Sequence, residues 1–265
     1  MKLKGNLIKM RTEAGQPVDY YLRLTNDEVY VNELIGKKLS IEYTGTIHCI
    51  ACGRKTNKSF HQGFCFSCFK TAPEADESVV RPELSMAQFG VARDLAWSEE
   101  HDLIEHYVYL SLTSGLKVGV TRHHQLPTRW IDQGASQAIK LALTPNRHIA
   151  GIIENYLKRS MADKTKWKDM LISTGETTID LLDEKKKAAA VLHPELQKYV
   201  FPGDEVYRIQ YPGVMPDETL QTVSLDKQAV LEGTLSAIKG QYLVFDNGAA
   251  FNVRKHNGYE IVVTF

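Results

Sequence analysis

Two pairs of cysteines constrain the fold of this chain more than any other feature. Cys49 and Cys52 form one C-x-x-C pair, Cys65 and Cys68 form the second, and twelve residues separate the pairs. Each pair can wrap one side of a tetrahedral Zn²⁺ ion, and four thiolates leave no ligand position open to water. The pattern therefore predicts a structural Zn²⁺ site, which stabilises a segment too small for its own hydrophobic core.

Other interpretations of the cysteine pattern stay open. Thioredoxin-like redox motifs share the C-x-x-C spacing, but no βαβ pattern surrounds either pair. Iron also binds four cysteines, and the spacing does not distinguish it from zinc. His48 and His61 flank the pairs and are alternative ligands. The basic and aromatic residues around the cysteines have two explanations. Either they contact nucleic acid, or the phenylalanines shield the metal and the lysines are solvated.

Length and composition indicate a folded protein of more than one domain. The 265 residues allow two or three small domains, and the 43% hydrophobic content argues against global disorder. No stretch approaches the ~20 apolar residues of a membrane span, and the N-terminal residues lack the apolar run of a signal peptide. We therefore expect a cytoplasmic protein without a membrane partner, whose cysteines form no structural disulfides. The sequence does not predict an oligomeric state.

The charges balance over the chain but not along it. Lys plus Arg and Asp plus Glu both number 32. Residues 71–105 hold nine acidic and two basic residues, a balance of −7, whereas residues 106–170 hold ten basic and four acidic residues, a balance of +6. A basic segment suits the phosphate backbone of a nucleic acid, although an ordinary solvated helix face has the same composition.

Both ends of the chain read as short β-strands. Residues 3–46 and 228–265 alternate apolar and polar positions between Gly, Asn and Asp residues. The two segments also look like a weak internal repeat, in which Gly5 corresponds to Gly233 and residues 36–41 to residues 258–263. Coincidence between two generic β meanders is the alternative. Since neither half has enough strand to bury a core, we expect the two ends to pack together as one antiparallel β domain.

The middle of the chain carries four reactive residues in a recognisable order. Tyr109 lies in a strand-like run, Lys117 precedes Val-Gly in a second run, Arg129 follows in P-T-R-W-I-D, and Glu154 lies in the helical pattern A-G-I-I-E-N-Y-L-K. This ordered set resembles the GIY-YIG nuclease superfamily. In that family two strands carry the Tyr and the Tyr or Lys, one helix presents the Arg, and a later helix presents a metal-binding Glu.

The resemblance implies a metal-dependent endonuclease that acts on nucleic acid, with DNA favoured over RNA and the choice between them left open. In such a site Glu154 holds Mg²⁺ or Mn²⁺, Arg129 clamps the phosphate, and Tyr109 orients or deprotonates the attacking water. Lys117 lies beside Tyr109 and is expected to lower its pKa. Gly119 is expected where the second strand ends tightly.

Each site residue also has a structural explanation. Tyr109 can be a half-buried strand residue, Lys117 a solvent-facing one, Arg129 a surface partner of Asp132, and Glu154 an i,i+4 helix partner of Lys158. Two further functions therefore stay open: a non-catalytic DNA- or RNA-binding protein on the same fold, and a zinc-stabilised protein-interaction scaffold. Tyr107, His123 and His124 are alternative bases or nucleic-acid contacts.

Nearly the whole chain also resembles a bacterial family of uncharacterised proteins known as a domain of unknown function, through H-C-I-A-C-G, G-F-C-F-S-C-F, R-P-E-L and P-T-R-W-I-D-Q-G-A. The predicted fold class is α+β, with a three-stranded antiparallel sheet and helices in the central α/β domain. The predicted order is an N-terminal β unit (1–46), a zinc module (47–70), an acidic linker (71–105), a GIY-YIG-like domain with a helical extension (106–200) and a C-terminal β unit (201–265).

Overall fold

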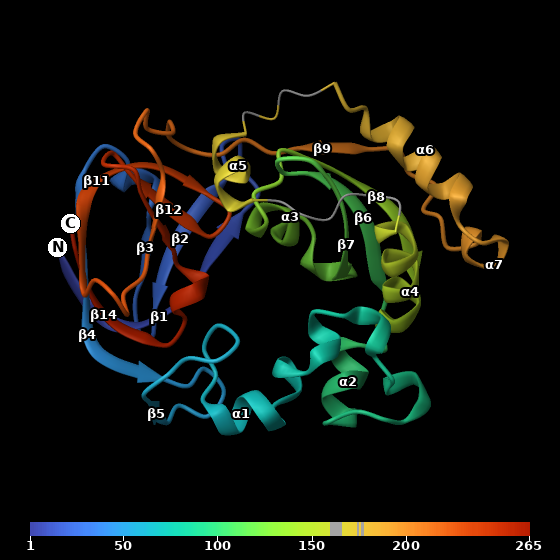
Figure 1. The fold of residues 1–265 in the computed structure, drawn as a ribbon, viewed down its shortest axis with the longest axis horizontal. Coiled ribbons are helices and arrows are strands. Elements are labelled where there is room, and N and C mark those ends of the chain that lie inside the picture. The colour runs from blue at the N-terminus through green and yellow to red at the C-terminus, as the bar shows by residue number, and fades with distance from the viewer. Residues whose placement is uncertain (160–165, 174, 176–177) are drawn as a thin grey trace. The chain divides into compact units, whose positions relative to one another are not determined.

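The computed structural model describes residues 1–159, 166–173, 175 and 178–265 (Figure 1). The chain forms two compact units. The first joins Met1–Ala75 to Gln210–Phe265, and the second is Asp76–Ile209. Both units combine antiparallel strands with helical segments, so the protein is α+β. Among the helices of the described residues, none is long and apolar enough to cross a membrane.

The first unit is built around one ten-stranded sheet that contains strands from both ends of the chain. The order along the sheet is β10-β13-β12-β11-β4-β14-β1-β2-β3, and β5 pairs with β4. Alternating apolar residues on these strands supply the core, as Tyr20, Leu22 and Leu24 do on β2. The strands are β1 (Lys2–Glu13), β2 (Asp19–Leu24), β3 (Glu28–Tyr30), β4 (Lys38–His48), β5 (Lys55–Thr56), β10 (Gln221–Val223), β11 (Val230–Lys239), β12 (Tyr242–Phe245), β13 (Ala249–Asn252) and β14 (Tyr259–Thr264).

The strand pairing of this sheet has the symmetry that the internal repeat implies. β1, β2, β3 and β4 correspond to β11, β12, β13 and β14, and the sheet order reads alike from either side of the β4–β14 pair. Gly5 pairs with Ile261, and the equivalent Gly233 pairs with Leu39. Ile41 pairs with Val263, its own counterpart in the repeat. The agreement in register favours a genuine repeat over coincidence.

The second unit contains a four-stranded antiparallel sheet in the order β7-β6-β8-β9. The strands are β6 (His106–Leu112), β7 (Leu116–Arg122), β8 (Gln137–Thr144) and β9 (Val206–Arg208). The predicted sheet had three strands and the predicted domain ended at residue 200. The fourth strand, β9, extends the unit to Ile209 because it pairs with the edge of β8, with Ile139 opposite Val206. A three-residue strand carries too little periodicity to be read from sequence.

Helices cover this sheet and create two cores. On one face Val108, Leu110 and Ile139 pack with Ile153 and Leu157 of α4. A smaller cluster of Tyr109, Trp130, Ala135 and Ala138 forms separately. The helices of the unit are α2 (Leu95–His101), α3 (Thr128–Asp132), α4 (Arg147–Lys158), α5 (Trp167–Ile172), α6 (Leu181–Val191) and α7 (Pro194–Gln197). The remaining helix, α1 (Phe66–Thr71), belongs to the first unit.

The acidic segment differs from the predicted linker. From Asp76 onward it is part of the second unit, where short 3-10 turns at Glu77–Val79, Pro82–Leu84 and Ala87–Phe89 precede α2. The turn at Pro82–Leu84 packs directly on α4 at Gly151. The contact is so close that a Cβ atom added at Gly151 would lie 2.1 Å from the backbone nitrogen of Glu83. The segment has few apolar residues in a regular period, so its sequence gave no sign of this packing.

Candidate functional site

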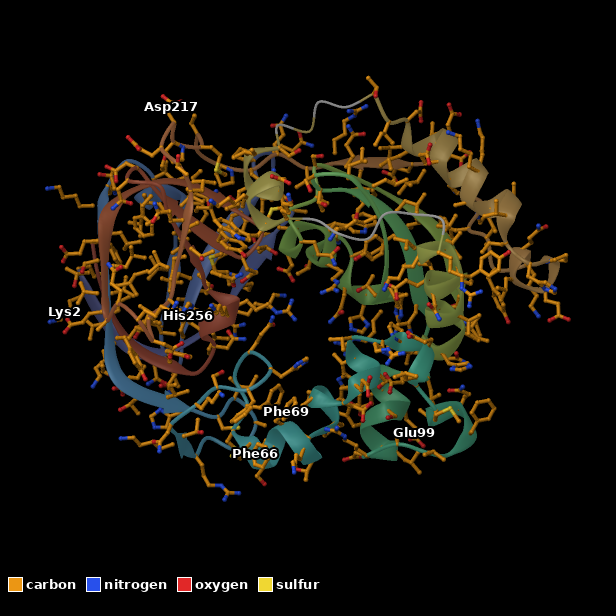
Figure 2. The ribbon with its side chains drawn as sticks, in the orientation of Figure 1. Lys2, Phe66, Phe69, Glu99, Asp217 and His256 are labelled. Carbon is orange, nitrogen blue, oxygen red and sulfur yellow. The ribbon has the colours of Figure 1, made fainter. Side chains whose placement is uncertain are left out.

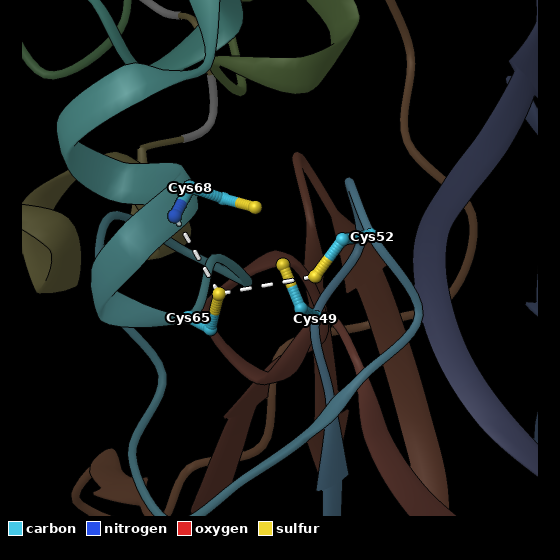
Figure 3. Close-up of side chains that lie close together, drawn as sticks. All are labelled: Cys49, Cys52, Cys65 and Cys68. Atoms are coloured by element: carbon cyan, nitrogen blue, oxygen red, sulfur yellow. Dashed lines mark hydrogen bonds between the residues drawn. The ribbon is translucent and has the colours of Figure 1, made fainter.

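The four cysteines converge in the first unit and are arranged to hold a metal ion (Figure 3). Their sulfur atoms all lie within 4.8 Å of one another, and the Sγ atoms of Cys52 and Cys65 are 3.9 Å apart. The edge of a tetrahedron with Zn–S bonds of ~2.3 Å is about 3.8 Å, so the observed separation fits four-coordinate Zn²⁺. All four cysteines are free thiols.

Local backbone structure places the four sulfurs. The first pair lies in a turn after β4, closed by hydrogen bonds from Gly53 N–H to Cys49 O (2.8 Å) and from Cys49 N–H to Arg54 O (2.9 Å). The second pair begins α1, where the sulfur of the N-cap residue Cys65 accepts a hydrogen bond from Cys68 N–H (3.5 Å). Figure 3 shows the side chains of both pairs directed toward a common centre.

The electrostatics of the cluster are those of a cation site. The backbone N–H of Arg54 is the main cause that lowers the pKa of Cys52 to about 6, whereas a hydrogen bond with Cys52 is the main cause that raises the pKa of Cys68 to about 12. Four adjacent sulfurs cannot all carry a negative charge without a cation between them. A divalent metal removes this conflict.

Tyr109 lies in the middle of β6 and is fully buried, rather than half-buried. Its hydroxyl donates a hydrogen bond to Gln133 Oε1 (2.7 Å), and its ring packs edge-on against Trp130. Gly119, opposite Tyr109 in β7, leaves room for the ring, since a Cβ there would lie 2.6 Å from the phenol oxygen. The prediction that Gly119 ends the strand is wrong, because β7 continues to Arg122.

The protonation of Tyr109 also differs from the prediction. Burial raises the pKa of Tyr109, and the opposing interaction with the Arg129 guanidinium is too weak to reverse the shift. Lys117 was expected to lower this pKa, but the net direction is upward. The folded protein therefore favours the neutral phenol, which donates a hydrogen bond more readily than it accepts a proton.

Arg129 lies on the short helix α3 and faces Tyr109. Burial by itself lowers the pKa of Arg129, but the neighbouring Tyr109, Asp132 and Glu154 outweigh it, so the pKa is raised and the guanidinium stays charged. Its Nε atom is buried and has no hydrogen-bond partner in the described part of the chain. A planar guanidinium with such a donor is suited to bind a phosphate oxygen.

Glu154 lies on α4, an amphipathic helix that begins where the Asn146 side chain accepts a hydrogen bond from Ile149 N–H (3.0 Å). The carboxylate is buried, and its Oε1 atom lies 3.3 Å from Nζ of Lys158. The i,i+4 ion pair of the structural explanation is therefore present. The Glu154 carboxylate also acts on the pKa of Tyr109 and of Arg129, raising both, although it is not the largest cause for either.

The remaining predicted residues lie around this cluster. Lys117 is half-buried on β7 and pairs with Ser111, two residues along β6 from Tyr109. Such diagonal neighbours lie about 7–8 Å apart across a sheet. His123 and His124 are exposed.

Two residues near the predicted set were missed by the sequence analysis. Gln133 holds the Tyr109 hydroxyl, and its position four residues after Arg129 was the available signal. Arg147 donates hydrogen bonds to the carbonyls of Ser78 (2.9 Å) and Val79 (2.7 Å) in the acidic segment. No local pattern in the sequence indicates that contact.

Together the observations describe an α+β protein with four cysteines arranged to hold a metal ion in one unit, and with Tyr109, Arg129 and Glu154 in the other. Over residues 36–261 the chain matches the family described as protein of unknown function (DUF2797), and it belongs to that family. No curated protein and no solved structure matches the chain.

Proposed function

We propose that this protein binds nucleic acid and cleaves phosphodiester bonds with a divalent metal at the cluster of Tyr109, Arg129 and Glu154. The observation that carries the proposal is that Tyr109 on β6 and Arg129 on α3 affect each other's pKa, and that Glu154 on α4 affects the pKa of both. The chain order of the elements, two paired strands followed by the Arg helix and the Glu helix, is the order that the GIY-YIG resemblance implies, which supports the proposal.

Each residue has a distinct part in the proposed reaction. Glu154 holds Mg²⁺ or Mn²⁺, ions that take one or two carboxylates and fill the remaining positions with water and phosphate oxygens. The metal supplies Lewis-acid stabilisation of charge on the phosphate. Arg129 binds the same phosphate through its guanidinium. Tyr109, held neutral and with its hydroxyl proton donated to Gln133, orients the attacking water by accepting a hydrogen bond from it, and Lys117 adds positive charge nearby.

The four-cysteine centre has a structural part in this proposal. We assign Zn²⁺ to it because the 3.9 Å sulfur separation fits the zinc tetrahedron and because four thiolates fill every position around the ion. No water can then bind the metal for catalysis. The centre instead fixes α1 and the turn after β4, which have few buried side chains of their own.

The burial of Tyr109 favours a second function, nucleic-acid binding without cleavage. A residue that is 0% exposed touches neither substrate nor water in this conformation. The proposed enzyme therefore requires a shift of the surrounding side chains when substrate binds, whereas a binding protein requires only exposed basic residues, such as Lys166 and Lys168.

A cleavage screen separates these functions. Purified protein is incubated with single-stranded, duplex and branched DNA and RNA, with Mg²⁺, Mn²⁺ or EDTA. We expect metal-dependent products, and we expect binding that weakens steeply with salt. Neutralising Lys166 and Lys168 should reduce this salt dependence; Lys164, of the same group, lies outside the described residues. Binding without products would leave the non-catalytic function, and no binding at low salt would leave the interaction scaffold.

A further inference from the structure

We infer that the four-cysteine module binds single-stranded nucleic acid through the rings of Phe60, Phe66 and Phe69 together with Lys58 and Lys70. The inference rests on the proposed function, because it names the form of substrate that the protein holds. It concerns residues of the first unit only, so it can fail while the proposed cleavage site stands.

The exposure of the rings separates two roles among the phenylalanines of the module. Phe64 is 5% exposed and packs inside, as expected for a side chain that shields the metal. Phe66 is 53% exposed although it lies one residue after a cysteine ligand. A ring that served only to cover the metal would be buried like Phe64. The exposed position of Phe66 therefore calls for a different explanation.

The three rings form one continuous group. The centroid of Phe60 lies 5.4 Å from that of Phe66 and 5.8 Å from that of Phe69, and the Phe60 and Phe69 rings are nearly parallel at 20°. Phe66 and Phe69 are three residues apart on α1 and so project from the same side of that helix (Figure 2). Such a group offers flat apolar surface on which nucleobases can stack.

A lysine ammonium lies over the Phe60 ring and another over the Phe66 ring, and the module contains no acid. Nζ of Lys58 lies 5.3 Å from the Phe60 ring centroid, and Nζ of Lys70 lies 4.6 Å from that of Phe66. Residues 43–73 hold four basic residues and no Asp or Glu. Four thiolates around one divalent cation contribute −2, so the module keeps a net charge of +2. This positive charge attracts the negatively charged phosphate backbone of a nucleic acid. It gives no attraction for a protein surface with few acidic residues.

The backbone holds this surface in place. Phe60 and Phe64 pair as an isolated β-bridge around His61 and Gln62, which both have positive φ angles of 44° and 65°. Residues other than glycine rarely adopt this conformation, so the surrounding structure must fix the loop. The metal fixes the other side through Cys65 and Cys68 on α1. A rigid platform loses little conformational entropy when it binds.

The exposed rings and lysines of the module favour single-stranded over double-stranded nucleic acid. In a duplex the faces of the bases are already stacked on one another, whereas in a single strand they are free to stack on aromatic side chains. Lysines beside the rings then reach the phosphates between successive bases. Exposed rings and cations side by side therefore match unpaired nucleotides better than they match a double helix.

Binding of fluorescein-labelled oligo(dT) tests the inference, with a duplex of equal length and an abasic strand as comparison probes and oligo(rU) as the RNA arm. Phe66→Ala should weaken oligo(dT) binding roughly five- to one-hundredfold, the range for loss of one base–aromatic stack. It should have little effect on the abasic strand, which keeps its phosphates. Phe89→Ala is the matched control, because Phe89 is a similarly exposed phenylalanine (64%) of the second unit.

Two further variants test whether weaker binding by Phe66→Ala comes from loss of the ring and not from misfolding. Phe66→Trp keeps a stacking ring and should restore affinity, with quenching of the new tryptophan when oligo(dT) binds. Lys58→Gln should weaken binding to the normal and the abasic strand alike. Equal effects of Phe66→Ala and Phe89→Ala on oligo(dT), or equal loss on oligo(dT) and the abasic strand, would overturn the inference while leaving cleavage unaffected. Failure to bind any nucleic acid would overturn both the inference and the proposed function.

Discussion

Glu154, the proposed metal ligand, already forms an ion pair with a lysine of its own helix. Nζ of Lys158 is 3.3 Å from the carboxylate, and the lysine side chain is itself only partly buried. A divalent ion at Glu154 has to compete with this ammonium group. The ion pair therefore sets the metal concentration at which the site fills.

Removal of this competitor should make metal binding easier. An i,i+4 pair of this kind is worth about 0.3–0.5 kcal/mol, so Lys158→Gln should lower the Mg²⁺ concentration for half-maximal cleavage about twofold. Lys187→Gln, which breaks the Lys187–Glu184 pair of α6, is the control and should leave the Mg²⁺ dependence unchanged. An increased Mg²⁺ requirement in Lys158→Gln would mean that the lysine assists the site instead of competing for it.

His106 makes the stability of the protein sensitive to acid. The side chain is fully buried, and burial lowers its pKa from 6.5 to about 3, against a smaller opposing effect of the Ile104 carbonyl. The folded state keeps His106 neutral, whereas the unfolded chain takes up a proton below pH ~6.5. The free energy of unfolding should therefore fall as the pH drops from about 6.5 toward 3, by about 1.4 kcal/mol per pH unit.

Urea unfolding at several pH values measures this slope. His106→Gln should have a shallower slope than the wild type in this window, while the exposed His123→Gln should keep the wild-type slope. Burial also lowers the pKa of His256 in the first unit. Because His256 is present in all three proteins, a difference in slope between the wild type and His106→Gln is due to His106. Parallel slopes in all three would contradict the assignment.

At the scale of elements, the acidic segment is held on α4 by close backbone contact. Gly151→Ala places a methyl group where the backbone of Pro82 and Glu83 now lies, so it should release the turn at Pro82–Leu84 from α4. We expect faster proteolytic cleavage and faster hydrogen exchange within residues 76–93. Gly115→Ala, where a Cβ meets no atom within 4 Å, is the control. Unchanged exchange in Gly151→Ala would show that the segment does not depend on this contact.

The metal centre is the second element whose integrity can be measured. Purified protein should contain about one zinc per chain, and Cys49→Ser combined with Cys65→Ser should remove it, because one ligand is lost from each pair. Hydrogen exchange should then increase in residues 49–70. If the protein contains iron, the assignment of zinc is wrong but the structural role of the metal stands. If protein purified without chelators contains no metal, the structural role is contradicted.

These elements also show what sequence reasoning can and cannot reach. The convergence of the four cysteines was predictable because they are close in the chain and have the spacing of a Zn²⁺ site. The internal repeat of the sequence agrees with the register of β1, β4, β11 and β14, because equivalent glycines lie at equivalent positions of the paired strands. By contrast, β9 and the packing of Pro82–Leu84 depend on contacts with distant residues and leave no periodicity in their own segments.

The same division applies to the proposed catalytic residues. The order Tyr109, Lys117, Arg129 and Glu154 was visible in the sequence, but the burial that raises the pKa of Tyr109 was not, because it depends on Trp130 and Gln133 packing around the ring. Residue type and spacing predict which groups meet. The state of charge of each group depends on the tertiary environment, which no local pattern encodes.

For the whole molecule, the proposed function places a metal-dependent phosphodiesterase site in the second unit and a metal-stabilised module in the first. In this proposal cleavage depends on the charge of Glu154, whereas nucleic-acid binding does not. A neutral isostere at this position separates the two properties, because it keeps the shape of the side chain and removes the metal ligand.

The most direct measurement is cleavage and binding by Glu154→Gln beside the wild type and Glu184→Gln. Glu184 is the matched control, a helical glutamate paired with a lysine in α6 of the same unit. With the substrate that the wild type cleaves, in Mg²⁺ or Mn²⁺, Glu154→Gln should lose cleavage by at least about a hundredfold, a loss of about 2.7 kcal/mol in transition-state stabilisation, while its affinity stays equal or rises. Glu184→Gln should match the wild type in both. Cleavage by Glu154→Gln at the wild-type rate would contradict the account.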